Sequence, residues 1–395
     1  MLQSLERLPD DPILGLAAAC RADPNPNKVD LTIGIYMDEQ GLCPVFEAVQ
    51  QAQQVLMAEE TTKAYMPPAG DEAFNRGMQK LLLGEGSVAL ADGRVGSIQT
   101  PGGCGALRIG AEIIQAAKPG TRVWVSNPTW PVHVPLLGSV GLQFETYRYY
   151  EPSDHSVDFD GMVEDLKRAE AGEVVLLHGC CHNPCGADLT LAQWQTIASM
   201  AQQQGFIPFV DIAYQGLGDG LEKDAAGLRT LVDQLPEVIV AASCSKNMGL
   251  YRERTGLTLF VAQGADNATA LVSQAKVAAR RVYSMPPAHG AIIAGRILED
   301  RALNTLWQKE LVAMCERING LRADLVSKLN ASTGRDYSFI QREKGMFSFL
   351  GLSVEQAVRL RREHGVYMLD SSRINVAGVN AGNIDYLAEA VAKVL

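Results

Sequence analysis

The sequence predicts an α/β protein with a mostly parallel central sheet flanked by helices, together with a smaller α+β domain. The chain has 395 residues, more than one compact core usually holds, so we expect two domains. Short apolar runs alternate with longer amphipathic stretches through the middle of the chain, which is typical of a parallel sheet covered by helices. After about Asp300 a long charged helical pattern is followed by short mixed elements, which is typical of an α+β domain.

The strands expected in the large domain are short, apolar on both faces and bounded by turn residues, as strands buried between helices are. They are Arg122–Ser126, Val174–His178, Ile207–Asp211, Val238–Ser243 and Leu257–Val261. The helices expected between them include Ala106–Ala117, Leu191–Gln204 and Ala268–Arg281. Towards the C-terminus we expect a helix over Arg301–Leu329, elements over Tyr337–Leu350 and Ser353–His364, and a final helix; Pro9–Tyr36 is expected to be rich in loops.

Charge and composition exclude several classes of function. The chain holds 35 lysines and arginines against 45 acidic residues, a net charge of −10, so it lacks the basic surface that nucleic acids and anionic membranes require. The N-terminus has no signal-peptide pattern, and no apolar run approaches the roughly 18 residues of a membrane span. Eight cysteines without a secretory signal are typical of reduced thiols, so we expect a cytoplasmic protein.

Small, polar or ionisable residues follow each of the expected strands. Because ligands bind outside the carboxyl ends of the strands in open α/β sheets, these segments predict one site. They are Pro101–Gly105 (after Ile98–Thr100), Asn127–Trp130, His178–Gly186, Asp211–Tyr214 and Ser243–Lys246.

Three of these residues suit chemistry on an aromatic aldehyde cofactor. Lys246 follows a buried strand, where a dry, cation-rich pocket lowers an amine pKa and makes the amine a nucleophile towards carbonyls. Asp211 can pair with a protonated pyridine nitrogen, and Tyr214 can donate to a phenolate oxygen. Taken one at a time, a surface lysine, a loop acid and a packed tyrosine explain them as well.

The glycine-rich turn Pro101–Gly105 precedes a predicted helix, whose free N–H groups suit a phosphate. The turn lacks the dinucleotide and Walker spacings, and Arg254 and Ser243 could complete a phosphate site. Trp130 could stack on a ring, or simply pack in the core. Arg373, set among small and apolar residues, suggests carboxylate recognition, with a structural ion pair as the alternative.

Cys180-Cys-His-Asn-Pro-Cys185 has residue types that bind zinc. No second Cys/His cluster follows it, and adjacent cysteines do not easily face one ion, so we expect no metal site. We interpret Asn183-Pro184 as a turn that presents the Asn183 amide, with the cysteines packed as small hydrophobic residues.

In this order the residues resemble the class I aminotransferases of the aspartate and aromatic amino acid type, within fold-type I of the pyridoxal-phosphate enzymes. The resemblance runs from Leu31–Tyr36 to Arg373–Gly378 and is most specific in five stretches. They are Arg122–Trp130, Val174–Gly186, Asp211–Gly216, Ser245–Tyr251 and Tyr283–Gly290.

The resemblance implies a role for each site residue. Lys246 would hold pyridoxal phosphate covalently and shuttle a proton, in a ping-pong mechanism through aldimine and ketimine states. The remaining contacts to the cofactor would come from Asp211 (backed by His133) at the pyridine nitrogen, Tyr214 and Asn183 at the phenolic oxygen, Trp130 on the ring, and Gly103, Cys104, Ser243, Ser245 and Arg254 at the phosphate. Arg373 would bind the substrate α-carboxylate, with Asn183, Trp130 and the Gly34 backbone assisting.

Two residues of this set would come from a partner subunit: Tyr65 at the phosphate and Arg280 at the second carboxylate of dicarboxylic substrates. The resemblance therefore implies a homodimer with shared active sites. It also implies that an N-terminal arm and part of the small domain occupy residues 1–40, the large cofactor-binding domain 41–305, and the small C-terminal domain 306–395.

The chain departs from the family pattern at Cys104 (usually Thr or Ser), at Ser372 (usually Gly) and at Met66-Pro-Pro68. A thiol is a poor phosphate donor, so the Cys104 contact should be weak. At the rim, less polar residues replace those of strict aspartate enzymes, which favours aromatic rings; these are Met37, Cys43, Ala64 and Met285. We predict transfer from tyrosine and phenylalanine, and from aspartate, to 2-oxoglutarate. The alternatives are a strict aspartate aminotransferase, a β- or γ-lyase on the same cofactor, and a non-catalytic ligand sensor.

Overall fold

The computed structural model describes residues 2–8 and 12–395. The chain divides into two compact units, one formed by Pro44–Arg317 and the other by Met1–Cys43 with Ile318–Leu395. Helix α13 (Arg301–Thr333) begins in the first unit and ends in the second. No helix in the described part of the chain combines the length and apolar character that a membrane crossing demands.

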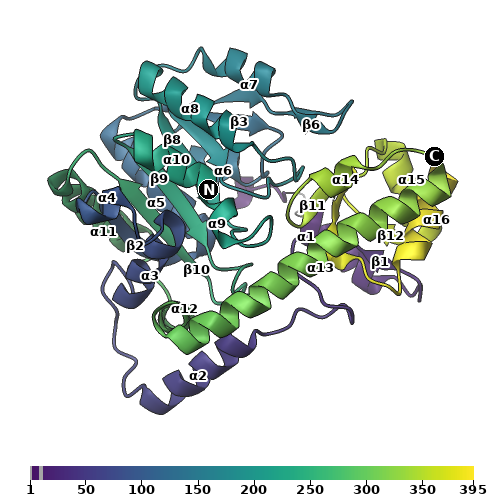
Figure 1. Cartoon of the computed structure of the whole chain (residues 1–395), viewed down its shortest axis with the longest axis horizontal. Coiled ribbons are helices and arrows are strands. Elements are labelled where there is room, and N and C mark those ends of the chain that lie inside the picture. The colour runs from purple at the N-terminus through teal and green to yellow at the C-terminus, as the bar shows by residue number, and fades with distance from the viewer. Residues whose placement is uncertain (1, 9–11) are drawn as a thin grey trace. The chain divides into compact units, whose positions relative to one another are not determined.

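A seven-stranded sheet forms the centre of the unit Pro44–Arg317, in the order β2-β10-β9-β8-β7-β3-β4 (Figure 1). Strand β10 is antiparallel to both of its neighbours, whereas the other pairs of this sheet are parallel. The mostly parallel sheet predicted from the sequence is therefore confirmed. The strands are β2 (Val95–Pro101), β3 (Arg122–Asn127), β4 (Gln143–Arg148), β7 (Val174–His178), β8 (Ile207–Ile212), β9 (Val238–Ser243) and β10 (Thr255–Val261).

The direction of β10 decides what lies at the functional edge of the sheet. The parallel strands β2, β3, β7, β8 and β9 all end at the same edge. Because β10 runs the opposite way, it begins at that edge, and the residue directly before it, Arg254, lies there as well. Strand β4, which is parallel to β3, ends there as well, so one sheet edge collects the ends of six strands and the start of the seventh.

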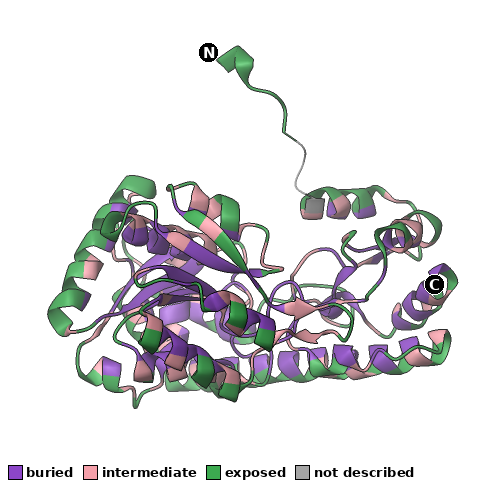
Figure 2. Cartoon of the chain, turned by 90° about the horizontal axis from the view of Figure 1, so that it is seen from above, coloured by how far each residue is buried: buried purple, intermediate pink, exposed green. Residues whose placement is uncertain are grey.

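Helices cover both faces of this sheet (Figure 1). On one face α5 (Gly102–Ala117) and α11 (Ala265–Val282) pack against β2, β9 and β10 in an apolar core that includes Ile109 and Phe260. Alternate strand residues such as Val175 and Val210 face the other way and are equally buried, as the purple sheet in Figure 2 shows. Strands apolar on both faces were the sequence signal for this arrangement.

The remaining elements of this unit connect or flank the sheet. Helix α8 begins after Thr190, whose side chain forms a capping box, and it is followed by Gly205, which adopts a left-handed conformation. The elements are α2 (Glu47–Glu59), α3 (Glu72–Leu83), α4 (Val88–Ala91), α6 (His133–Gly138), β5 (Tyr150–Glu151), β6 (Ser156–Val157), α7 (Phe159–Leu166), α8 (Leu191–Gln204), α9 (Leu221–Asp224), α10 (Ala226–Gln234) and α12 (Ala288–Glu299).

The second unit is an α+β arrangement of two small sheets and several helices around its own apolar core. Strand β1 (Val29–Asp30) pairs in parallel with β12 (Val366–Tyr367), so the N-terminal segment is joined to the C-terminal part of the chain. Strand β11 (Phe347–Phe349) pairs antiparallel with β13 (Arg373–Asn375). The other elements are η1 (Leu2–Ser4), α1 (Pro12–Ala22), α14 (Phe339–Arg342), α15 (Val354–His364), η2 (Val376–Gly378) and α16 (Ile384–Val394).

The expectation that Pro9–Tyr36 is rich in loops is wrong over α1, which occupies Pro12–Ala22. A proline suits the first position of a helix, and the run Leu16–Ala19 consists of the strongest helix formers. The apolar face of this segment is short, so its periodicity was a weak signal. Residues 9–11 lie outside the described part of the chain.

Candidate active site

Lys246 lies just beyond the end of β9, at the sheet edge where the parallel strands end. Its Nζ atom is 4.8 Å from the centre of the Tyr214 ring, in cation–π contact. Burial lowers the pKa of the Lys246 amine, and the nearby Arg254 acts in the same direction, against the opposing charge of Asp211 and the effect of Cys104. Compared with an exposed lysine, this amine is therefore shifted towards its unprotonated, nucleophilic form.

Asp211, near the end of β8, is the acidic group that interacts electrostatically with the Lys246 amine. Its Oδ2 lies 2.9 Å from Nε2 of His133, which is completely buried. Burial alone would raise the pKa of Asp211, but the hydrogen bond and charge of His133, with further help from His178 and Lys246, lower it overall. Asp211 is therefore an anion in a dry environment, which is the form that can pair with a protonated ring nitrogen.

A hydrogen-bonded chain extends behind Asp211. The hydroxyl of Thr129 lies 2.8 Å from Nδ1 of His133 and 3.2 Å from Nε2 of His178. With Asp211 ionised, His133 donates from Nε2, so its Nδ1 accepts from Thr129, whose oxygen accepts in turn from His178. The chain holds both imidazoles in one tautomer and the carboxylate in one orientation.

Two histidines of this region are neutral. Burial and the neighbouring His133 lower the pKa of His178 to about 3, and burial with the neighbouring His178 lowers the pKa of His182 well below its usual value. The two rings are tilted by 34° with centroids 3.9 Å apart, and His182 stacks on Tyr149 at 4.2 Å. They act as packed polar groups that orient their neighbours.

A site for an anion lies at the start of α5. Gly102 adopts a positive φ of 69°, and a Cβ atom there would lie 2.6 Å from Nη2 of Arg254, so only glycine allows the guanidinium to approach. The Oγ atoms of Ser243 and Ser245 are 3.0 Å apart at the end of β9. Backbone N–H groups of a 16-residue helix, two hydroxyls and a guanidinium are the groups that bind phosphate.

Cys104 lies in the first turn of α5 and is half-buried. Burial raises the pKa of its thiol, although Arg254 opposes the shift. Asp211 and Lys246 also act on this thiol electrostatically, which shows that the start of α5 and the ends of β8 and β9 converge. At Gly103, the residue before it, a Cβ atom would lie 3.3 Å from Cβ of Ser243, which is a tight contact.

Asn183 and Trp130 complete the set at this edge. Asn183 is buried in the segment after β7, and its Oδ1 has no hydrogen-bond partner. Such a group is costly to bury unless a ligand satisfies it. Trp130 is half-buried and meets His133 edge-on, with ring centroids 5.3 Å apart.

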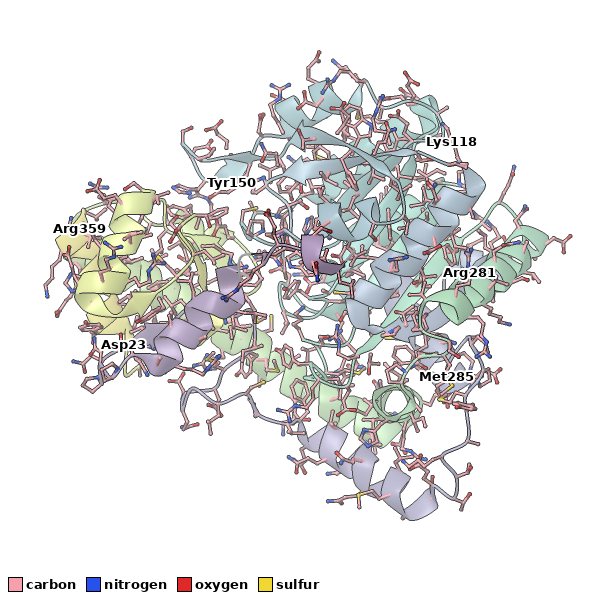
Figure 3. All side chains as sticks on the ribbon, turned by 180° about the vertical axis from the view of Figure 1, so that it is seen from behind. Asp23, Lys118, Tyr150, Arg281, Met285 and Arg359 are labelled. Carbon is pink, nitrogen blue, oxygen red and sulfur yellow. The ribbon has the colours of Figure 1, made fainter. Side chains whose placement is uncertain are left out.

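Two predicted residues of this unit lie on its surface. Tyr65 is 91% exposed in the connection between α2 and α3. Arg280 is exposed near the end of α11, where its guanidinium donates to the Ser284 hydroxyl. Met285 is half-buried in the connection between α11 and α12 (Figure 3). Within this unit the structure does not bring Tyr65 or Arg280 into contact with the residues described above.

Arg373 and Gly34 come together in the other unit, around one ring. The Arg373 guanidinium lies 4.5 Å from the centre of the Phe347 ring, and its Nη2 donates to the Thr32 carbonyl at 2.6 Å. A Cβ atom on Gly34 would lie 2.4 Å from Cζ of the same ring, so this position requires glycine. The Phe347 carbonyl in turn accepts from the buried Arg322.

Sequence reasoning missed Thr129, His178 and Phe347. Thr129 stands in the same Asn-Pro-Thr-Trp turn as Trp130, and His178 ends a predicted strand, so both positions carried a signal. No pattern linked Phe347 to Gly34 or Arg373, because the contact joins segments far apart in the sequence. Contacts of this kind require the fold.

Comparison with known proteins agrees with this geometry. The family model for aminotransferase class I and II matches residues 26–391. The chain is 47% identical to the aspartate aminotransferase of Escherichia coli strain K12, with all of both chains covered. It is 45% identical to the aromatic-amino-acid aminotransferase of Paracoccus denitrificans, again over the whole of both chains.

A solved structure shows the same fold. The aromatic-amino-acid aminotransferase from Burkholderia pseudomallei, in a structure covalently bound to pyridoxal phosphate, superposes with a TM-score of 0.98 at 40% identity and covers 100% of this chain and 99% of its own. The fold class expected from the sequence is therefore confirmed. The chain belongs to the aminotransferase class I and II family.

Proposed function

We propose that this protein is a pyridoxal-phosphate-dependent aminotransferase that moves the amino group of tyrosine, phenylalanine and aspartate to 2-oxoglutarate. One observation carries the proposal: the Lys246 amine with its lowered pKa, the anionic Asp211 and a helix start suited to an anion converge at one sheet edge. Relatives that carry the names aspartate aminotransferase and aromatic-amino-acid aminotransferase support it.

The residues of the site fit the cofactor. Pyridoxal phosphate supplies an electron sink for a carbanion at the substrate Cα and carries the amino group between the two half-reactions. Its phosphate suits the start of α5 with Ser243, Ser245 and Arg254, and its ring nitrogen suits Asp211. The unpartnered Oδ1 of Asn183 is an acceptor that a donor group of the bound cofactor or substrate would satisfy.

Lys246 has two tasks in this proposal. Its amine binds the cofactor's aldehyde carbon covalently, which requires the unprotonated form that burial favours. Once the substrate amine had displaced it, the same nitrogen would be placed to take the proton from the substrate Cα and to return it to the cofactor. Tyr214 lies against the Lys246 amine and limits where that amine can move.

Arg373 binds the α-carboxylate of the substrate, and Phe347 holds its guanidinium plane in place. A planar guanidinium binds a carboxylate with two parallel hydrogen bonds, which fixes the substrate's orientation. At the rim, Met285 and Ala64 offer apolar contact where strict aspartate enzymes tend to have asparagines. The free energy of burying an aromatic side chain of the substrate there is therefore more favourable.

The protein acts as a homodimer in this proposal, with Tyr65 and Arg280 of each subunit serving the other's site. Both side chains are exposed in the single chain and outside the Lys246 cluster, although each is of a type that binds carboxylates or phosphates. We propose a cytoplasmic location, which suits eight free thiols.

Mixing two variants that each lack dicarboxylate transamination tests the shared sites. A hybrid of Lys246→Ala and Arg280→Leu subunits contains one site with both residues native, so dicarboxylate transamination should reappear when the two proteins are dissociated and reassociated together. Each variant alone should lack that activity. A monomer in sedimentation, or no recovery in a verified hybrid, would exclude shared sites while leaving the aminotransferase activity untouched.

Steady-state kinetics test the substrate range. We expect kcat/KM values for phenylalanine, tyrosine and aspartate that lie within about two decades of one another, because one apolar rim and one dicarboxylate arginine serve them all. The product from each donor should be its keto acid. A hundredfold preference for aspartate would establish the strict aspartate enzyme instead, and release of ammonia with pyruvate would establish a lyase.

A further inference from the structure

Arg322 is a fully buried cation in the unit formed by Met1–Cys43 and Ile318–Leu395. It lies in α13, between the core residues Leu321 and Leu325. Its guanidinium donates to backbone carbonyls of the segment that leads into β11. These carbonyls belong to Ile340 (2.7 Å), Lys344 (3.1 Å), Gly345 (2.8 and 3.1 Å) and Phe347 (2.6 Å). One planar group therefore holds the turn before β11 and the first residue of that strand.

Glu343 places a second buried charge beside this guanidinium. Its Oε2 lies 3.7 Å from Nη1 of Arg322 and accepts a hydrogen bond from the Ser348 hydroxyl of β11. The desolvation of a buried ion pair offsets most of its Coulomb attraction, and packed apolar residues in the same place are often as stable. A pair of this kind contributes little net stability, and what it fixes here is the position of β11.

The strand that Arg322 fixes carries Phe347, whose ring contacts two elements of the predicted carboxylate site. The centre of the ring lies 4.5 Å from Cζ of Arg373, and a Cβ atom on Gly34 would lie 2.4 Å from Cζ of the ring. Because the ring meets both residues, a shift of β11 displaces the surface against which the Arg373 guanidinium rests.

Strand β13, which carries the substrate arginine, is bonded to the same strand and to the segment around Gly34. Phe347 is paired with Asn375 in the antiparallel register of β11 and β13. The Asn375 amide donates to the carbonyls on either side of Gly34, those of Ile33 and Ile35, at 2.7 and 2.8 Å. The Gly34 backbone and β13 are therefore both held in place relative to β11.

We propose that Arg322 is a positioning residue for the substrate α-carboxylate: it fixes Phe347, and the Phe347 ring in turn fixes the Arg373 guanidinium. This inference rests on the proposed function of Arg373. Arg322 acts only through its neighbours, because it is fully buried. A bidentate contact to a carboxylate needs the guanidinium in one plane, and a displacement of about 1 Å in such a site lowers a rate by about 10²-fold.

Two matched probes separate carboxylate binding from the rest of the site. Aminooxyacetate carries a carboxylate, O-methylhydroxylamine is the same nucleophile without one, and both react with the aldehyde carbon of pyridoxal phosphate. Stopped-flow absorption of the cofactor-loaded, full-length protein gives a rate constant for each. In Arg322→Met the rate with aminooxyacetate should fall by about ten- to hundredfold, whereas the rate with O-methylhydroxylamine should stay unchanged.

Equilibrium binding of 3-phenylpropanoate, which has a carboxylate and no amine, provides a readout that needs no reaction. Its Kd should rise by about tenfold or more in Arg322→Met. Arg359→Met is the matched control, because it makes the same change at an exposed arginine of α15 in the same unit, and it should match the wild type in all three measurements. Arg322→Lys keeps the buried charge, but one ammonium group cannot reach all four carbonyls, so it should show a smaller loss, confined to the two carboxylate probes.

Equal losses with the two nucleophiles in Arg322→Met, or an unchanged ratio of their rates, would overturn the positioning role. An unchanged Kd for 3-phenylpropanoate would overturn it as well, and a lower thermal midpoint beside it would show that Arg322 only stabilises the fold. If Arg322→Met fails to fold, Arg322→Lys decides the question by the same criteria. A wild type that reacts with neither nucleophile would instead overturn the proposed function, and this inference with it.

Discussion

Nε2 of His133 lies 2.9 Å from Oδ2 of Asp211, and the imidazole is completely buried behind the carboxylate. This contact sets the charge at the centre of the site. Together with His178 and Lys246, it outweighs the effect of burial and lowers the pKa of the carboxyl group. Thr129 links the same imidazole to His178, which is itself neutral, so the chain orients Asp211 without a second positive charge competing for it.

Asp211→Asn should lower kcat by about 10²- to 10³-fold, because a neutral amide does not stabilise a protonated ring nitrogen and the loss of one preorganised electrostatic contact typically costs this much. The loss should appear in kcat for every amino donor, because the carboxylate acts on the cofactor and not on one substrate. Steady-state kinetics with phenylalanine and aspartate measure it. Asp219→Asn, a nearby exposed carboxylate, is the matched control and should retain wild-type kcat.

The protein should lose stability as the pH falls from about 7 to 4. Burial lowers the pKa of His178 to about 3, below its ordinary value of 6.5, so over this interval the unfolded chain binds a proton that the folded chain does not. The contribution of neutral His178 to the free energy of unfolding is complete above pH 6.5 and is lost on acidification. The free energy of unfolding should then fall by up to about 1.4 kcal/mol per pH unit.

Denaturant unfolding at several pH values tests this origin. His178→Gln should reduce the slope of unfolding free energy against pH, because one proton uptake is removed. An unaltered slope in His178→Gln would mean that carboxyl groups alone govern the acid sensitivity.

Cys104→Ser should strengthen cofactor binding. A hydroxyl donates to phosphate better than a thiol does, and a hydrogen bond to a charged group contributes about 1.5–3 kcal/mol, so the Kd for pyridoxal phosphate should fall by about tenfold or more. Equilibrium titration of the apoenzyme measures the change. Cys43→Ser, at an exposed thiol, should have no effect, and an unchanged Kd in Cys104→Ser would place the phosphate elsewhere.

Arg280→Leu should separate the two substrate classes. Loss of a charge-assisted carboxylate contact should lower kcat/KM for aspartate by about 10²-fold or more and leave phenylalanine within a few-fold of the wild type. The adjacent Arg281, also exposed, provides a matched control, because Arg281→Leu removes the same charge one position along α11 (Figure 3). Equal losses for both donors would show that Arg280 has a structural role.

The sheet could be read from the sequence because its strands are apolar on both faces and end in distinctive residues. Val174–His178 and Val238–Ser243 have the bounds that the sequence predicted. Arg254 could be suspected as a phosphate ligand, but its place at the functional edge follows from the reversed direction of β10, which periodicity does not reveal.

Long-range contacts account for most of what the sequence left out. Asp224 meets Cys180 and Cys181 only because α9 lies beside the turn after β7, and Phe347 meets Gly34 only through the pairing of distant segments. Helix α1 was missed for a local reason, a short apolar face after an irregular start. Roles assigned through family resemblance, such as those of Tyr65 and Arg280, stay predictions because they depend on a second subunit.

The central claim is that the Lys246 amine binds pyridoxal phosphate covalently, and borohydride reduction tests it most directly. Reduction of the cofactor-loaded protein fixes the label on whichever amine holds it, and peptide mass spectrometry then locates it. We predict one phosphopyridoxyl group per chain, on Lys246, and none in the Lys246→Ala variant. A label on another lysine, or no label on a protein saturated with cofactor, would contradict the account.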